Sequence, residues 1–595
     1  MWALIARLLW MAQSSELSWA DEWPRPDQEA FMQVEHGDMT TNDFTGAIVD
    51  SELSGHAAAD AQGFGSRILA SIRRDREASA LLLVALVSGA ITHAYHIFIY
   101  PLYVTDEGIY LERAWSVMRQ GALSPYTYTY DHAPAGWLMI AAWISILPRQ
   151  FQTFGSAENA GRVLMVLVHL ASVFFLFQVT RRLSGSRTAA FVATVFFNFS
   201  PLAIFYQRQV VLDNLMVFWV LLSLYLASGH DQRVLTPMFS GLAFGVGVLT
   251  KENAIFFMPG LAYLLYGTVR NQLNRRFALG LSAFLSVSII SMYFLNAVLK
   301  NELLPAQFNF DLNIPPSSHV SLLYTIWQQL HRNQGSLLDR NSLVWQFSLG
   351  AWLPKDTFLI VAGTASTVAN LILGWRDRSR HQGELVAALL AGGYLLYLAR
   401  GSVILEFYVV PLVPFLAMNM GLVISRLLPI LAGGSVSLRA AMLGVFFVVL
   451  LSPIGGYFLV RDAAGKVVPH DLYKLDLTGI QAQELRFVRT QIPSDSRIIM
   501  DEELWVDLHD IAPTYPYAVS HFEATGDPVI RDQLFHQDFN NVDYVVMSNK
   551  MRRTMQQDNT TGQYNWIFDL LDNHAQRIWM VQHGGIELEI WQVQH

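Results

Sequence analysis

The sequence predicts an all-α polytopic membrane protein with about eleven transmembrane helices, followed by a small extracytoplasmic α/β domain at the C-terminal end. The 595 residues are 52% hydrophobic and only 15% charged, whereas soluble domains carry roughly 25% charged residues. The mean hydropathy of +0.30 excludes a disordered chain and argues against a soluble enzyme. The net charge of −8 gives no reason to expect a nucleic-acid partner. The absence of cysteine excludes disulfides, thiolate metal sites and cysteine nucleophiles.

Residues 1–78 are predicted to be a disordered acidic region on the cytoplasmic side of the membrane. Acidic residues dominate between residues 16 and 60, where Arg25 stands almost alone against them. The region also lacks periodic apolar spacing. A segment of this kind cannot bury enough apolar surface to offset the entropy of folding.

Residues 79–460 are predicted to be the transmembrane domain, because eleven apolar segments follow one another there. Some are shorter than the roughly 20 residues that a bilayer-spanning helix needs, so flanking residues must complete them. The segments are residues 80–100, 163–179, 189–205, 210–227, 236–249, 254–266, 277–299, 358–373, 385–398, 403–424 and 440–459.

Positive charges predict the orientation of these segments. When the segments are counted alternately, all the arginine clusters fall on one side, and short loops rich in Lys and Arg are cytoplasmic. We therefore expect a multi-pass protein of the plasma (inner) membrane with a cytoplasmic N-terminus and an external C-terminus. The arginines are Arg73, Arg74 and Arg76, then Arg181, Arg182 and Arg187, then Arg270, Arg275 and Arg276, then Arg376, Arg378 and Arg380, and finally Arg426 and Arg439.

Residues 135–147 are also apolar, but they are predicted to be a helix lying at the outer membrane interface. The segment is short and is bracketed by Pro134 and Pro148. Counting it as a span would move Arg181 and its neighbours to the outside, so an interfacial position is preferred. The predicted external parts are residues 101–162, 300–352 and 461–595.

The tail, residues 461–595, is long enough for a small α/β domain. Thr478 is predicted to cap a helix that carries Ile480, Leu485 and Val488 on its apolar face. Short β-branched or alternating segments indicate strands. The predicted strands are residues 497–500, 542–547 and 586–593.

Asp106 and Glu107 are adjacent carboxylates six residues beyond the first span. Close like charges near lipid raise the pKa of at least one member of such a pair. A raised pKa suits a general base that takes a proton from an acceptor hydroxyl. The alternative is a solvated pair at a helix start, where acidic side chains complement the helix dipole.

His132 and the pair Arg208 and Asp213 are the next candidates. His132 suits phosphate binding, and Asp131 beside it could orient the ring. Arg208 and Asp213 lie at membrane depth, where ionisable groups cost about 2.5–3.5 kcal/mol each and tend to face a functional cavity. A structural salt bridge between Arg208 and Asp213 is the alternative.

Lys251 and Arg400 are cations in turns on the predicted outer side. The positive-inside rule disfavours cations there, and a phosphate at headgroup level would compensate for them. The alternatives for Lys251 are pairing with Glu252 or snorkelling to the headgroups. If the predicted topology holds, all the candidates can surround a single outward-facing cavity. They are Asp106, Glu107, His132, Arg208, Asp213, Lys251 and Arg400.

The order and topology of these motifs resemble the C-type membrane glycosyltransferases that use polyprenyl-phosphate sugars. Within them the chain is most similar to the protein O-mannosyltransferase branch and to the bacterial aminoarabinose transferases of lipid A, over about residues 80–426. The matching motifs are Asp106-Glu107, Asp131 to Pro134, Gly161-Arg162, Arg181 to Leu183, Ser200-Pro201 followed by Arg208, Gly241 to Lys251, and Phe407 to Pro414.

The resemblance implies an inverting transfer of a sugar from a polyprenyl-phosphate donor to a hydroxyl of a protein, lipid or envelope glycan at the outer face of the membrane. It implies Asp106 as the base, with Glu107 assisting, and Lys251, Arg208 and Arg400 as contacts of the donor phosphate. His132 is a further phosphate candidate, although this chain has His-Ala-Pro where many members have a doubled proline.

The alternative function is a transporter or flippase of a lipid-linked or anionic envelope precursor. Transporters often contain internal repeats with sites near the midplane of the membrane, and this sequence has neither feature. The sequence identifies no cofactor with certainty, and metal dependence stays open. A divalent cation held by Asp213 and Glu107 is an alternative way to hold the phosphate, but no dedicated ligand spacing is present. Other expected partners are membrane lipids and the acceptor.

Overall fold

The computed structural model describes residues 75–229, 235–270, 272–305, 320–331, 337–400, 404–431, 433, 435–438, 440–444, 476–559 and 562–595. Contacts divide the chain into two units, Met1–Leu83 and Val84–His595. The described part of the first unit includes only the start of helix α3 (Arg76–Ala94), so the following concerns the second unit. Nearly all of the predicted region 1–78 lies outside the described residues, as do most of span 440–459 and part of loop 300–352.

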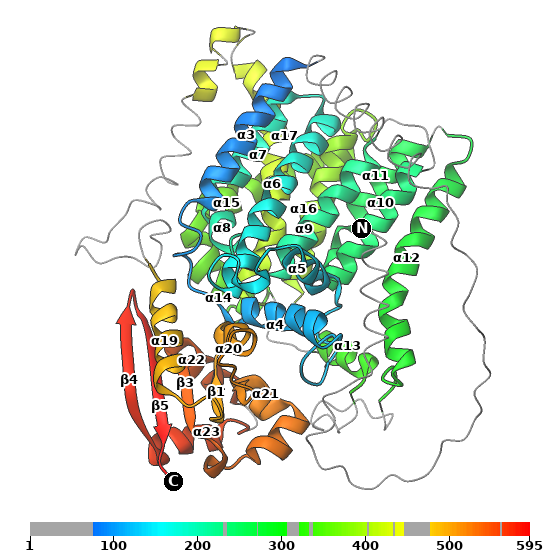
Figure 1. The fold of residues 1–595 in the computed structure, drawn as a ribbon. Coiled ribbons are helices and arrows are strands. Elements are labelled where there is room, and N and C mark those ends of the chain that lie inside the picture. Colours follow the sequence, from blue (N-terminus) through cyan, green and yellow to red (C-terminus); the bar gives the residue numbers. More distant parts are fainter. Residues whose placement is uncertain are drawn as a thin grey trace, which may run out of the picture. The chain divides into compact units, whose positions relative to one another are not determined.

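The bundle of apolar helices follows the predicted order along the chain (Figure 1). Six segments are long and apolar enough to cross a membrane, judged by length and composition. These are Arg76–Ala94, Ala157–Ser184, Arg275–Leu299, Leu343–Arg376, Gln382–Ala399 and Glu406–Leu431. The prediction of a helical multi-pass membrane protein with a small C-terminal sheet is confirmed, whereas six of the described segments, and not eleven, have this length.

The bounds of the individual elements are as follows. The bundle contains α3, α6 (Ala157–Ser184), α7 (Arg187–Phe199), α8 (Pro201–Tyr206), α9 (Leu212–Ala227), α10 (Leu235–Thr250), η2 (Glu252–Phe257), α11 (Met258–Val269), α12 (Arg275–Leu299), α15 (Leu353–Arg376), α16 (Gln382–Ala399), η4 (Glu406–Leu412) and α17 (Val413–Leu431). The connecting elements are α4 (Thr105–Arg119), α5 (Ala135–Ser145), η1 (Gln150–Gln152), α13 (Leu322–His331), α14 (Leu343–Phe347) and η3 (Ser348–Trp352).

One predicted span is interrupted for a local reason, and two others are separated by the predicted turn around Lys251. Segment 189–205 divides at Ser200, whose hydroxyl accepts the Ala203 N–H at 3.3 Å as the N-cap of α8, and Pro201 supplies the first residue of that helix. Further on, α10 ends at Thr250, and Lys251 is extended (φ −157°, ψ 126°) before the 3₁₀ helix η2 begins. This break carries the buried side chain of Lys251 out of the regular helical surface.

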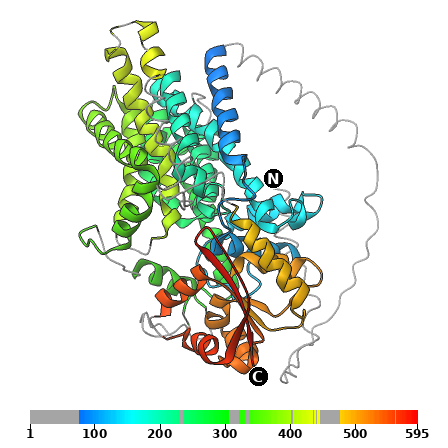
Figure 2. The same ribbon diagram turned by 90° about the vertical axis from the view of Figure 1, so that its left-hand side faces the viewer.

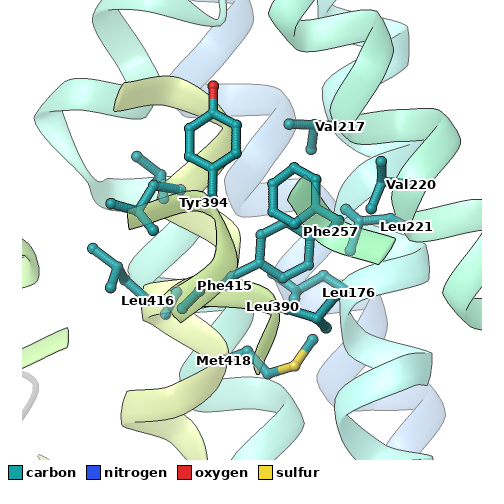
Figure 3. Close-up of a cluster of buried hydrophobic side chains, with 14 of the residues drawn as sticks. Leu176, Val217, Val220, Leu221, Phe257, Leu390, Tyr394, Phe415, Leu416 and Met418 are labelled. Atoms are coloured by element: carbon teal, nitrogen blue, oxygen red, sulfur yellow. The ribbon is translucent and has the colours of Figure 1, made fainter. Parts of the chain in front are cut away.

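Aromatic packing holds η2 in place next to this break (Figure 3). The ring of Phe257 in η2 lies 4.9 Å from the ring of Tyr394 and 4.6 Å from that of Phe415, measured between centroids. Asn253 donates from Nδ2 to the Tyr394 hydroxyl at 3.0 Å. Aromatic contacts of this kind add about 0.5–1.5 kcal/mol to the burial of their apolar area. The core therefore fixes the segment that follows Lys251.

The predicted interfacial segment 135–147 is the helix α5. It packs against α4, α9 and α10 and buries Trp137 and Ile140 completely. Pro134 takes the N-cap position, as expected from its place just before the apolar run.

The C-terminal residues form a five-stranded sheet with the strand order β2-β1-β3-β5-β4. The long strands near the C-terminus are the red ribbons in Figure 2. β1 (Ile498–Met500) pairs in parallel with β2 (Ala518–Ser520) and with β3 (Tyr544–Ser548). β5 (Ile586–Val593) runs antiparallel to β3 and to β4 (Ala575–His583). The remaining elements are α19 (Thr478–Gln491), η5 (Glu502–Leu504), α20 (Trp505–Asp510), α21 (His521–Gly526), η6 (Ile530–Phe535), η7 (Phe539–Asn541), α22 (Asn549–Asp558), α23 (Asn565–Asp569) and η9 (Leu570–His574).

The predicted strands 497–500, 542–547 and 586–593 correspond to β1, β3 and β5. β2 and β4 were not predicted. The prediction that Thr478 caps its helix is wrong, because Leu477 takes the N-cap position of α19. The hydroxyl of Thr478 instead donates to the Phe98 carbonyl at 2.6 Å and ties the helix to the chain before α4.

The C-terminal sheet and the first loop share one hydrophobic cluster. Leu111 of α4 and Trp137 of α5 belong to the same buried cluster as Met500, Trp505 and Leu508. The backbones also approach closely, since a Cβ built on Gly108 would lie 2.4 Å from the carbonyl carbon and oxygen of Glu502. A glycine is therefore required at this contact between α4 and η5.

We expect Gly108→Ala to destabilise the packing of the C-terminal residues on α4. The added methyl group overlaps main-chain atoms that cannot rotate away, and overpacking of this kind costs roughly 1–3 kcal/mol. The variant should melt at a lower temperature and be cut faster by protease after about residue 475. Gly392→Ala in α16 is the matched control, because nothing lies within 4 Å of its built Cβ. Equal stability of the two variants would contradict the expected close contact.

Candidate functional site

Lys251 and Asp213 form a buried ion pair where α10 ends and α9 begins. Lys251 Nζ lies 2.5 Å from Asp213 Oδ2, and the two side chains are 3% and 0% exposed. The predicted alternatives, Asp213 with Arg208 and Lys251 with Glu252, are therefore wrong. Breaking one partner of such a buried pair leaves an uncompensated charge, which is strongly destabilising.

The surroundings of this pair leave capacity for a further ligand. The second oxygen of Asp213, Oδ1, is buried and has no hydrogen-bond partner among the described residues. On the other side, the Lys251 ammonium lies 4.1 Å from the ring centroid of Tyr408 and 5.0 Å from that of Phe407. The cation thus rests between a carboxylate and two aromatic faces, which hold it in one place.

Asp106 lies in the first turn of α4 and is partly exposed. The Tyr110 hydroxyl donates to its Oδ1 at 3.5 Å. Burial raises the pKa of Asp106, and the positive charge of Lys251 is the largest effect that opposes this rise. The negative charge of Asp213 contributes to the rise. Since such effects weaken with distance, the carboxyl lies near the Lys251–Asp213 pair.

His132 also belongs to this neighbourhood, because its charge acts on Asp106. Its Nδ1 lies 3.2 Å from Glu252 Oε2, and Glu252 Oε1 accepts the Ala133 N–H at 2.6 Å. Burial lowers the pKa of His132, but the hydrogen bond and charge of Glu252 outweigh it, so the pKa lies above the usual value. Glu252 is thus the partner of His132, a role that the sequence did not suggest.

Asp131 acts on His132 through its charge and through the His132 main chain, but its side chain is bound mainly by another residue. Its two oxygens are bound by Arg113, with Nη1 at 3.0 Å from Oδ1 and Nη2 at 3.1 Å from Oδ2. The Arg113 guanidinium also lies 5.0 Å from the ring centroid of Trp137. The arrangement joins α4 to the segment before α5, so Asp131 serves the structure of the loop.

Glu107 does not share a site with Asp106, although the two residues are adjacent. Glu107 is fully buried and receives Nε and Nη2 of Arg162 at 2.9 and 2.8 Å. It also accepts the N–H groups of Val210 and Val104 at 3.0 and 3.2 Å. With four donors its oxygens are occupied, so the predicted roles as assisting base and as metal ligand do not fit its surroundings. Glu107 positions α4 against α6.

Arg208 does not face the pair either. It is fully buried and donates from Nη2 to the Thr92 carbonyl at 2.6 Å and from Nη1 to the Tyr100 carbonyl at 3.4 Å. These carbonyls lie near the end of α3 and just after it. The predicted contact with a donor phosphate is therefore not supported by the position of Arg208, which satisfies main-chain acceptors.

Arg400 is exposed at the end of α16. Its guanidinium lies 5.0 Å from the ring centroid of Tyr397, and that ring lies 6.4 Å from the ring of Tyr408. Since Tyr408 touches Lys251, two aromatic rings separate Arg400 from the buried pair. The structure thus brings together Asp106, His132, Asp213 and Lys251, and leaves Arg400 at the edge.

Sequence reasoning missed two cations near this site. Lys355 Nζ lies 2.5 Å from Glu406 Oε1 and 5.2 Å from the ring centroid of Phe205. Like Lys251, it is a cation at the end of a span on the side where cations are disfavoured, and this signal could have identified it. Lys550 of α22 is close enough for its charge to act on Asp106. No sequence signal links a lysine in the C-terminal domain to the first loop.

Glu523 of α21 supports a prediction of pH-dependent stability. Burial, and next the charge of Asp527, raise its pKa from 4.5 to about 8. Because the pKa in the folded state is the higher one, the folded state holds the proton more tightly, and stability falls as the pH rises from 4.5 to 8. We expect Glu523→Gln to melt at a higher temperature than the wild type at pH 8.5 and at the same temperature at pH 4.5. The exposed Asp572→Asn should show no such difference.

Comparisons with known proteins point to one class of membrane enzyme. Residues 131–295 match the family model described as dolichyl-phosphate-mannose-protein mannosyltransferase. A curated relative, the undecaprenyl phosphate-α-4-amino-4-deoxy-L-arabinose arabinosyl transferase 2 of Proteus mirabilis, is 27% identical over 155 residues. That match covers 25% of this chain and 28% of the relative. The chain therefore aligns with less than a third of the relative's length.

Solved structures extend the likeness beyond this segment. The crystal structure of ArnT from Cupriavidus metallidurans, bound to undecaprenyl phosphate, has a TM-score of 0.52 at 16% identity and covers 87% of this chain and 98% of its own. The chain has the fold of the C-type membrane glycosyltransferases. An oligosaccharyltransferase of Archaeoglobus fulgidus has a TM-score of 0.50 at 13% identity, with 83% of this chain and 71% of its own covered.

The family model covers only part of the site. The matched residues 131–295 contain His132, Asp213 and Lys251. Asp106, in α4, precedes them, and Arg400 follows them. The resemblance predicted from the sequence is confirmed, while the roles of the individual residues remain proposals.

Proposed function

We propose that the protein transfers a hexosyl or pentosyl group from a polyprenyl-phosphate donor to an acceptor hydroxyl at the external face of the inner membrane, with inversion at the anomeric carbon. The observation that carries the proposal is the position of the partly exposed Asp106 beside the buried Lys251–Asp213 pair. The relatives support the donor class, since one is named for an undecaprenyl-phosphate sugar and another is bound to undecaprenyl phosphate.

In the proposed step, Asp106 takes the proton of the acceptor hydroxyl while the oxygen attacks the anomeric carbon. The bond from that carbon to the phosphate oxygen breaks, and polyprenyl phosphate leaves with the electron pair. A carboxyl whose pKa is raised by burial is a better base than a fully solvated one. One such in-line displacement inverts the configuration of the sugar.

The negative charge that develops on the leaving phosphate needs fixed cations. Lys251 is held in a site with little water, where a charge stabilises the transition state more strongly than in bulk solvent. We propose that Lys251 contacts the phosphate, and that His132, with its raised pKa, and Arg400 at the rim contribute positive charge. By the positive-inside rule, the topology predicted from the sequence gives these residues an external position, opposite the arginine-rich turns.

A transfer assay tests the proposal. The purified chain in lipid nanodiscs is given undecaprenyl-phosphate donors carrying labelled aminoarabinose or mannose, together with lipid A precursor or a Ser/Thr-rich peptide. We expect label to move covalently from one carrier to one acceptor, with product of inverted configuration by NMR. Label that crosses the bilayer of sealed vesicles without forming a new glycosidic bond would instead establish the flippase alternative.

A further inference from the structure

A group of buried metal-ligating side chains lies in the C-terminal sheet, apart from the proposed transfer site. Asp501 directly follows β1, Glu502 follows it in η5, and His521 directly follows β2. One oxygen or nitrogen of each residue lies within 4.8 Å of those of the other two. The closest ion pair in the group joins His521 Nδ1 and Glu502 Oε1 at 3.9 Å.

The topology of the sheet makes this position a typical place for a ligand. β1 pairs in parallel with β2 on one side and with β3 on the other. The chain therefore leaves the carboxyl end of β1 in one direction and later returns on its opposite side. Parallel sheets bind ligands outside the carboxyl ends of their strands where the strand order reverses in this way. Asp501 is the first residue after β1, the strand at this reversal, and His521 is the first residue after β2, so both lie at the carboxyl edge of the parallel strands.

The side chains have unused ligand atoms. Glu502 and His521 are each 1% exposed. Among the described residues, neither carboxylate oxygen of Glu502 and neither ring nitrogen of His521 has a hydrogen-bond partner at normal distance and angle. The Ser520 hydroxyl acts on Glu502, and the Met500 carbonyl on His521, only as weaker contacts. Asp501 is anchored through Oδ2, which accepts the Ser548 hydroxyl at 2.6 Å. Burying polar atoms without well-formed hydrogen bonds costs about 1–3 kcal/mol each, so a bound ligand would stabilise these side chains.

The side chains around the group are acidic. Glu503 and Glu484 are also buried, and the charge of Asp501 acts on both of them. Lys550 is a cation whose charge acts on Asp501 and Glu503. A bound divalent cation would displace protons from these acids and balance their charges.

We propose that Asp501, Glu502 and His521 bind a divalent transition-metal ion, Zn²⁺ or Mn²⁺, that holds the C-terminal sheet against the first loop. An imidazole with two carboxylates suits a borderline cation better than Ca²⁺ or Mg²⁺, which prefer oxygen alone. Tetrahedral ligands around zinc are about 3.4 Å apart, so small side-chain shifts bring the three atoms into reach of one ion. The site is structural, because main-chain atoms of Glu502 pack on Gly108 and close it from that side.

Through this contact the ion would stabilise the helix that carries Asp106. Glu502 belongs to η5, and η5 packs on α4 at Gly108, two residues after Asp106. A second tie runs through Gln481, which donates from Nε2 to Glu503 Oε1 at 3.1 Å and receives the Tyr103 N–H at 3.0 Å. Metal loss should therefore loosen both ends of the segment from Tyr103 to Gly108.

The test uses the full chain, purified in detergent with a tag free of histidine, stripped with EDTA and dialysed. Zn²⁺ or Mn²⁺ is then added, unbound ion is removed, and metal content is measured by mass spectrometry together with the melting temperature. We expect close to one ion per chain and a rise in melting temperature of several degrees. The ion that gives the higher metal content and the larger rise identifies the metal. Neither measurement depends on sugar transfer, so the result is separate from that of the proposed function.

Two variants distinguish a metal site from a group of protonated acids. Glu502→Gln should lose the ion and the rise in melting temperature, and His521→Ala should do the same. Glu112→Gln, which changes another buried acid outside the group, should keep both. If the wild type binds less than about a tenth of an ion per chain, or if Glu502→Gln binds as much as the wild type, the proposal is overturned.

Discussion

Asp106→Asn is expected to lower the rate of sugar transfer by roughly 10²–10⁴-fold, the usual contribution of a positioned general base. The amide has nearly the same size as the carboxyl and still accepts the Tyr110 hydroxyl, but it cannot take the proton of the acceptor. Donor binding should change little, so the loss should appear in kcat. The measurement is initial-rate kinetics of the transfer assay, with the melting temperature as a check of folding.

Glu112→Gln is the matched control for this substitution. Glu112 lies in the same helix, is 3% exposed, and burial raises its pKa well above the usual value. Its isosteric replacement should keep transfer within about twofold, since burial favours the uncharged form that the amide resembles. Transfer by Asp106→Asn at the wild-type rate would remove Asp106 from the mechanism.

The pH profile of the wild type gives an independent test of Asp106. The base must be ionised, and burial raises its pKa. The acid limb of kcat/KM should therefore lie above the pH expected for a solvated aspartate, near 3.9. In Lys251→Met the opposing positive charge is lost, so this limb should move to still higher pH.

Lys251→Met is the second large effect, with an expected loss of roughly 10²–10³-fold in kcat, as for removal of one preorganised charge contact in the transition state. The substitution also leaves Asp213 buried and unpaired, which costs about 3–5 kcal/mol of stability. The single variant alone therefore cannot separate catalysis from folding.

The double variant Lys251→Met with Asp213→Asn separates the two effects. Removing both charges leaves a neutral, packed pair. The melting temperature of the double variant should therefore return most of the way to that of the wild type, while the rate of transfer stays low. Recovery of both properties would mean that the pair serves only the fold. Arg400→Met, at the exposed rim, should reduce transfer less than Lys251→Met because solvent screens its charge.

The helices of this fold could be predicted because lipid requires long apolar segments, and ten of the predicted segments fall on described helices. The turn around Lys251 was also predicted, because charged residues separate two apolar segments there. The break at Ser200 and Pro201 was not predicted, because a hydropathy average gives little weight to one or two residues. β2 escaped prediction because three residues carry too little periodicity to be distinguished from a loop.

The site was predictable in its chemistry but not in its pairings. Lys251 and Asp213 stood out because charges at membrane depth are costly, and the structure places them together. The same reasoning selected Glu107 and Arg208, which are equally buried but are satisfied by Arg162 and by main-chain carbonyls. A costly buried charge reveals that a partner exists, and only the three-dimensional arrangement reveals whether the partner belongs to the fold or to a substrate.

The hydrophobic cluster that joins α4 and α5 to the C-terminal sheet limits how such proteins can be recombined. A chimera that exchanges only the last 120 or so residues with those of a relative would pack the relative's tail against side chains of α4 and α5 that do not fit it. Such an exchange should therefore preserve the fold only when the stretch from Tyr103 to Ile144 is transplanted as one piece with the tail.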